Sequence, residues 1–125
     1  MNIYAAIGGA STVSAAVDDF YRRVLADAEL SGYFSEVDVD RVKAHQRAFL
    51  AAALGGPTVY RGRSVREAHA RLRIRDADFD RVVSHLAATL TSLGVSGPTI
   101  GMIAEVLGPL REQIVDEPAD AAVLG

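Results

Sequence analysis

Apolar residues recur with a helical period along almost the whole chain. A stripe at spacings of three, four and seven runs through residues 13–25, and similar stripes predict helices over 40–54, 65–73, 77–93 and 99–115. No segment alternates apolar and polar residues as a half-buried strand does. We therefore predict an all-α fold.

Glycine and proline punctuate these helices. The glycine pair at 8–9 predicts a turn before the first long helix, which Ser11 or Thr12 would cap. The Gly-Gly-Pro triplet at 55–57 ends the second helix, and residues 31–38 break the pattern between the two.

The composition indicates one globular domain. The chain has 125 residues, of which 50% are hydrophobic and 23% charged, and we expect a domain over 1–116 with an acidic, disordered tail at 117–125. A net charge of -3 argues against nucleic acid or an anionic membrane as the main partner. The longest apolar run, 48–54, is too short to span a bilayer, and no signal peptide is recognisable, so we expect a cytoplasmic protein. Without cysteine the chain has no disulfide or thiolate metal site.

The second predicted helix carries a polar residue on its apolar face. Val42, Phe49 and Leu50 define the stripe, Gln46 falls in its middle, and His45 lies on its edge. A buried amide without a partner costs about 1–3 kcal/mol. Gln46 therefore either bonds to another helix or points into a pocket.

His69 repeats this arrangement in the next helix, where it lies in the stripe of Val65, Ala68 and Leu72. A lone histidine on an apolar face is more often a core residue than a ligand, and for His85 a core or surface role is favoured over ligation. Two such histidines on helices joined by a Gly-Gly-Pro bend suggest a planar cofactor between them, since imidazole is a common axial ligand of haem iron. No zinc-binding spacing is present.

Residues 61–75 contain six arginines and one acid. The aromatic residues that single-strand nucleic-acid binders interleave are absent from this segment, so a solvated helix face is favoured. Some of these arginines could instead pair with haem propionates.

Several motifs in order resemble the truncated haemoglobins of the first, N-type group. They are "IYAAIGG", "DFYRRVLAD", "YFSEVD", "RVKAHQRAFLAAALGGP", "YRGRSVREAH" and "HLAATLTSLGV", and together they span about residues 3–115. Each motif is weak, but the ordered set is specific. The resemblance implies a two-over-two helical sandwich around a b-type haem.

The same resemblance implies roles for individual residues. His69 would be the proximal iron ligand, Phe34 would pack on the porphyrin, and Tyr21 with Gln46 would donate hydrogen bonds to bound dioxygen. The rest of the pocket would come from Val42, Phe49, Leu50, Tyr60, Val65, Leu72, Ile74 and Phe79.

Two positions depart from the family pattern. Many members carry an aromatic pair where this chain has Phe49-Leu50, so the gating of a ligand tunnel is left open. Many carry a lysine at the position of His45, whereas in some cyanobacterial members a histidine there binds the iron. We favour a propionate or solvent contact for His45, with reversible iron ligation as the rival.

The leading functional hypothesis is a haem protein that binds dioxygen and other diatomic ligands and converts nitric oxide to nitrate, with electrons from an unidentified reductase. The alternative is a six-coordinate haem protein for electron transfer or sensing, gated by His45. A cofactor-free helical interaction module is the third reading, and we disfavour it.

Overall fold

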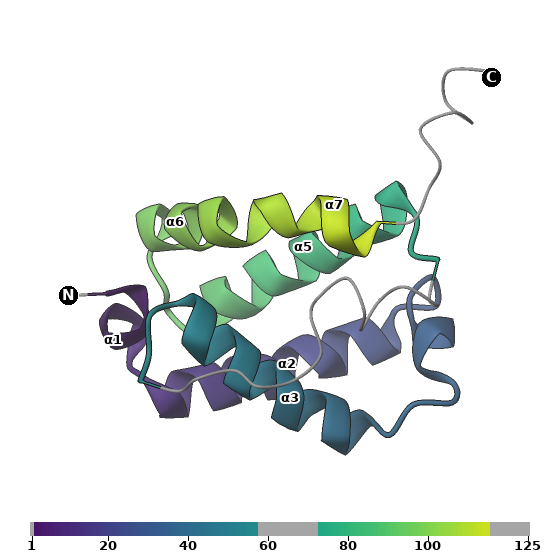
Figure 1. Cartoon of the computed structure of the whole chain (residues 1–125), viewed down its shortest axis with the longest axis horizontal. Coiled ribbons are helices and arrows are strands. Elements are labelled where there is room, and N and C mark those ends of the chain that lie inside the picture. Colours follow the sequence, from purple (N-terminus) through teal and green to yellow (C-terminus); the bar gives the residue numbers. More distant parts are fainter. Residues whose placement is uncertain (1, 58–72, 116–125) are drawn as a thin grey trace.

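A computed structural model describes residues 2–57 and 73–115 of the chain. These residues form helices and no extended strand, which confirms the all-α prediction. Figure 1 shows α2 and α3 below, and α5 with α6 and α7 above. The elements in chain order are α1 (Ile3–Ile7), α2 (Ala10–Ala26), η1 (Ser31–Phe34), α3 (Val39–Ala53), α5 (Asp76–Ser92), α6 (Gly97–Leu107), η2 (Gly108–Leu110) and α7 (Arg111–Ile114).

The N-terminal end holds a helix that the sequence did not predict. Asn2 caps α1, because its Oδ1 accepts a hydrogen bond from the Ala5 amide at 2.9 Å. Gly8 and Gly9 both have positive φ, 115° and 73°, and turn the chain directly into α2. That helix begins at Ala10 with Gly9 as its N-cap, so the predicted cap at Ser11 or Thr12 is wrong by two or three residues.

Helix α3 is fixed at both ends by short-range bonds. The Asp38 side chain caps its start by accepting from the Arg41 amide at 3.2 Å. At its end the Gly56 amide donates to the Ala51 carbonyl at 2.8 Å, and the Tyr4 amide donates to the Leu54 carbonyl at 3.0 Å. The glycine pair thus ends the helix as predicted, and α1 is bonded to the same turn.

The predicted C-terminal helix over 99–115 is divided in two. Ser96 caps α6, which begins at Gly97, and the helix ends at Leu107. Gly108 and Pro109 then form the tight turn η2 before α7. Proline has no amide hydrogen to donate and clashes with the preceding turn, so an unbroken helix is not available there.

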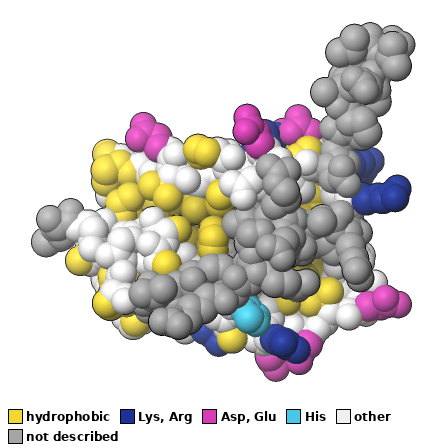
Figure 2. Space-filling view, in the orientation of Figure 1, with side chains coloured by type: hydrophobic (Ala, Val, Ile, Leu, Met, Phe, Trp, Pro, Cys, Tyr) yellow, Lys and Arg dark blue, Asp and Glu magenta, His cyan; other side chains and the backbone are white. Residues whose placement is uncertain are grey.

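The hydrophobic core lies where α2 packs on α3 and α5, with α6 covering it. Hydrophobic side chains also gather between α6 and α3 on the face seen in Figure 2. None of the helices formed by residues 2–57 and 73–115 is long and apolar enough to cross a membrane. The buried core cluster comprises Val13, Ala16, Val17, Tyr21, Leu50, Leu54, Leu90 and Ile103.

Two predictions fall on residues that the structure does not describe. The tail 117–125 is one, and most of the predicted helix 65–73 is the other. Only Arg73 of that helix is described; it is exposed, and its φ of 51° is not helical, so the helix does not reach residue 73. The next residue, Ile74, pairs with Val115 in an isolated bridge that joins the start of α5 to the end of α7.

Candidate functional site

Tyr21 is a buried phenol within an aromatic cluster. It lies in α2 and is 5% exposed. Its ring contacts Phe20 at 5.0 Å and Phe34 at 5.7 Å between centroids, both edge-on, with interplanar angles of 81° and 87°. Burial raises the pKa of Tyr21 to about 12. The phenol is therefore protonated at neutral pH and can act as a donor.

The Tyr21 hydroxyl has no hydrogen-bond partner among the described residues. The side chain as a whole is buried, and a desolvated hydroxyl normally finds a partner. Desolvation is also the one cause that shifts its pKa. The Tyr21 hydroxyl is thus available to donate a hydrogen bond to a bound ligand.

Helix α3 presents the second set of predicted site residues. Leu50 is buried in the core cluster, and Val42 packs against that cluster from one helical face. Gln46 and Phe49 are half-buried on the same face, as the wheel predicted. The Gln46 side chain makes no hydrogen bond to any residue of the described ranges. A second donor is therefore available beside the apolar stripe.

His45 lies at the solvent-facing edge of this face. It is exposed on α3, and within the described part of the chain its imidazole has no ion-pair or hydrogen-bond partner. The position agrees better with a solvent or propionate contact than with a side chain packed inward.

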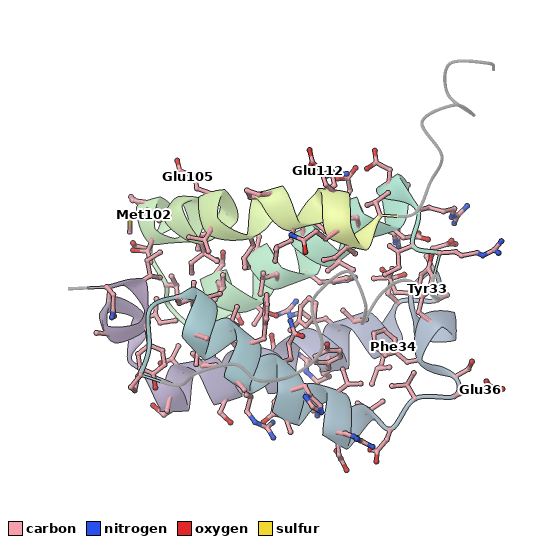
Figure 3. The ribbon with its side chains drawn as sticks, viewed as in Figure 1. Tyr33, Phe34, Glu36, Met102, Glu105 and Glu112 are labelled. Atoms are coloured by element: carbon pink, nitrogen blue, oxygen red, sulfur yellow. The ribbon has the colours of Figure 1, made fainter. Side chains whose placement is uncertain are left out.

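Phe34 is half-buried in η1, with its ring against Tyr21. The residue before it, Tyr33, donates its hydroxyl to Asp78 Oδ2 at 2.5 Å. In Figure 3 Tyr33 and Phe34 lie at the end of the bundle where η1 approaches the start of α5, while Glu36 points outward. Phe34, the predicted porphyrin contact, is therefore connected to α5 through the hydrogen bond of the adjacent Tyr33.

Ile74 and Phe79, two further predicted pocket residues, lie at the start of α5. Phe79 is buried in α5, and the Arg111 guanidinium lies 4.6 Å from its ring centroid. Ile74 is half-buried and bridged to Val115. Four further predicted pocket residues, Tyr60, Val65, His69 and Leu72, lie outside the described residues.

An ion cluster that the sequence did not predict joins α2 to α5. The Asp27 carboxylate accepts from Arg81 at 2.9 and 3.1 Å and lies 2.8 Å from His85 Nε2. Arg81, and then His85, hold the pKa of Asp27 well below its usual range. His85 is thus a partner of Asp27, which agrees with the structural role expected for it. The partners are 54 and 58 residues from Asp27, so no local pattern could have revealed them.

A similar pair of bonds stabilises the middle of α2. Asp19 accepts from Arg23 Nε at 2.8 Å and also pairs with Arg22. These arginines, Arg23 before Arg22, keep the pKa of Asp19 below its usual range. Within the described ranges, no group of three histidine, cysteine or acidic side chains could hold a metal ion.

Comparison with known proteins identifies this arrangement. The model of the bacterial-like globin family matches residues 2–116. The group 1 truncated haemoglobin of Tetrahymena pyriformis is 37% identical over 113 residues, which are 90% of this chain and 93% of that protein. A group 1 truncated haemoglobin of Synechocystis is 42% identical over 110 residues, covering 85% and 89% of the two chains.

Solved structures agree with the sequence comparison. The Fe(III) form of the Tetrahymena pyriformis protein superposes with a TM-score of 0.89 at 36% identity, covering 94% of this chain and all (100%) of the other. The 2/2 haemoglobin of a Synechococcus species, solved in the cyanomet state with covalently attached haem, gives 0.88 at 33% identity, with coverage of 94% and 100%. The predicted two-over-two globin fold is confirmed, and the chain belongs to the bacterial-like globin family as a group 1 truncated haemoglobin.

Proposed function

We propose that this chain, a haem-binding globin, binds dioxygen reversibly and uses it to convert nitric oxide to nitrate. The observation that carries the proposal is the buried Tyr21 phenol, which has no hydrogen-bond partner among the described residues. A donor in a desolvated site binds a polar ligand more strongly than the same donor would in water. Dioxygen is a suitable ligand, because it becomes partly negative when it is bound in a globin and so attracts a donor.

The described residues fit a b-type haem on its distal side. Such a pocket needs apolar walls and few donors, and Val42, Phe49 and Leu50 supply the walls on α3. Phe34 contributes an aromatic face, and Tyr21 and Gln46 are the donors. The wall residues carry no charge that would have to be desolvated.

When bound, the haem supplies the iron at which a diatomic ligand is held. Tyr21 would donate its hydroxyl proton in a hydrogen bond to that ligand, and its raised pKa of about 12 keeps the proton in place throughout the physiological range. Gln46 would donate from its amide nitrogen. The aromatic contacts with Phe20 and Phe34 restrict the phenol to one orientation.

We propose His69 as the proximal iron ligand, on the family resemblance and on its place within an apolar stripe. Replacing His69 with alanine should abolish stable haem binding, measured by the Soret band of purified protein after addition of haemin. His85→Ala is the matched control, because His85 is bonded to Asp27, and it should retain haem. A normal haem spectrum in the His69 variant would refute the assignment.

Nitric oxide dioxygenation is the finer part of the proposal. Dioxygen, nitric oxide and one electron combine to give nitrate, so turnover needs an electron donor, which we take to be a separate reductase. Mixing oxygenated protein anaerobically with one equivalent of nitric oxide should give one equivalent of nitrate and oxidised protein. Nitrite, or release of unreacted nitric oxide, would leave reversible dioxygen binding as the function.

A further inference from the structure

A buried carboxylate connects the start of α5 with the aromatic cluster around Tyr21. Asp78 is 2% exposed, although it carries a charge in the first turn of α5. Its Oδ2 accepts from the Tyr33 hydroxyl at 2.5 Å and from Arg75 Nε at 3.2 Å. A buried charge is tolerated only when it is paired and hydrogen-bonded, so these bonds keep Asp78 in place.

Capping of α5 does not explain Asp78. An acid near a helix N-terminus is favourable in general. Here the N-cap of α5 is Arg75, which makes no side-chain capping bond, and the hydrogen bonds of Asp78 within the described ranges are to the side chains of Tyr33 and Arg75. The carboxylate is therefore directed at η1, an element 45 residues earlier in the sequence.

Element η1 itself is short and weakly held. It is a single turn of four residues, and its backbone bonds include Tyr33 N to Leu30 O at 3.1 Å and Ser35 N to Gly32 O at 3.3 Å. Such turns are less stable than an α-helix. Besides these bonds, the contacts of η1 with the described residues include those from Tyr33 to Asp78 and from Phe34 to the ring of Tyr21.

The two attachments leave the same turn from adjacent residues. Tyr33 reaches α5, and Phe34 meets the Tyr21 ring edge-on at 5.7 Å. Any movement of Tyr33 is transmitted through one peptide unit to Phe34. Because Tyr21 is packed between Phe20 and Phe34, a shift of Phe34 frees one side of the phenol.

We propose that Asp78 and Tyr33 are positioning residues for the distal donor: their hydrogen bond fixes η1, so that Phe34 holds the Tyr21 hydroxyl in line with the bound ligand. This inference rests on the proposed function, in which Tyr21 donates to a diatomic ligand. The alignment matters because hydrogen bonds weaken steeply as they bend. Neither residue touches the ligand.

The charge state of the pair suits a permanent attachment. The Tyr33 hydrogen bond, ahead of Arg75, lowers the pKa of Asp78 despite its burial. Burial, and then the Asp78 carboxylate, raise the pKa of Tyr33. The phenol therefore stays protonated and the carboxylate ionised at neutral pH, which gives a charge-assisted bond.

The test is Tyr33→Phe, which removes one oxygen and keeps the ring. The haem-loaded ferrous protein would be studied as its carbon monoxide complex, in which the C–O stretching band reports how well a distal donor is aligned. We expect an added band at higher wavenumber and a weaker nuclear Overhauser effect between the rings of Phe34 and Tyr21. Dioxygen should dissociate about threefold faster, a small fraction of the effect of removing the Tyr21 donor.

Matched variants separate positioning from general loss of stability. Tyr4→Phe makes the same chemical change on α1 and should alter none of these signals. Asp78→Asn should reproduce the infrared change, and Tyr33→Phe with Asp78→Asn should add nothing to either single variant.

The outcomes also separate this inference from the proposed function. If Tyr21→Phe moves the carbon monoxide band but Tyr33→Phe moves neither the band nor the ring contact, the positioning role is overturned and the donor role stands. If Tyr21→Phe itself leaves the band unchanged, the donor role fails first, and the inference fails with it.

Discussion

Replacing Tyr21 with phenylalanine tests the central feature of the site. The change removes one hydroxyl oxygen and leaves the ring, so the edge contacts with Phe20 and Phe34 remain. The side chain is buried, and its hydroxyl has no partner among the described residues. Its removal should therefore weaken ligand binding and change the stability of the ligand-free protein little.

The magnitudes follow from burial. A hydrogen bond to a partly charged ligand in a desolvated site contributes about 1.5–3 kcal/mol. Since 1.4 kcal/mol is a factor of ten, dioxygen should leave the variant roughly 10–100 times faster. In the ligand-free protein no described residue bonds to this hydroxyl, so the variant should be as stable as the parent to within about 1 kcal/mol.

Two assays measure these effects. Stopped-flow displacement of dioxygen by carbon monoxide gives the dissociation rate, and urea unfolding of the ligand-free ferrous protein gives the free energy of unfolding. Tyr4→Phe is the control for both. A dissociation rate within twofold of the parent, or a clear loss of stability without ligand, would show that the protein itself binds the phenol and would refute the reasoning.

Three further predictions concern the framework and His45. A Cβ on Gly56 would lie 2.8 Å from a ring carbon of Tyr4 on α1 and 2.9 Å from the backbone oxygen of Ala51, so Gly56→Ala should destabilise the protein by about 2 kcal/mol. Gly101 lies on an open face of α6, so Gly101→Ala should stabilise the protein by about 0.5–1 kcal/mol. Urea unfolding measures both changes. Because folding lowers the pKa of Asp27, its ion pairs add stability above the unfolded value of about 3.9 and lose it as the pH falls further. The stability deficit of Asp27→Asn should therefore be constant near neutrality and shrink progressively below about pH 4; a deficit that does not shrink at all between pH 4 and pH 2 would contradict this. Glu105→Gln, on the outer side of α6 in Figure 3, is the matched control, since it removes a carboxylate that has no hydrogen bond or ion pair with a described residue. Since His45 is exposed, His45→Ala should change carbon monoxide association less than about twofold in flash photolysis, and a marked acceleration would indicate that His45 closes the site.

Helical periodicity was sufficient for the long helices. The apolar stripes predicted α2, α3 and α5 to within three residues at each end, because a helix that buries one face must repeat apolar residues at that period. Periodicity missed α1, whose five residues are too few to show a period. It also predicted one helix where the structure has α6 and α7, separated by the turn at Gly108 and Pro109. Pro109 indicated a break there, but the apolar stripe continues across it and favoured one helix.

Periodicity also predicted part of the candidate site, and the family motifs supplied the rest. The wheel placed Gln46 on the inward face of α3 and His45 at its edge, and the structure agrees. The roles of Tyr21, Phe34 and His69 came from the ordered family motifs, and His69 is still a prediction because the structure does not describe it. Periodicity alone would have classed Tyr21 as one more core residue of α2.

Local periodicity and the ordered motifs were enough to identify the long helices, the faces those helices bury and the family of the chain. The bonds from Asp78 to Tyr33 and from Asp27 to Arg81 and His85 became known from the folded structure alone. An acid on a helix has the same local pattern whether it faces water or a partner 45 to 58 residues away. The packing of whole helices brings such partners together and excludes the water that would otherwise weaken their bonds.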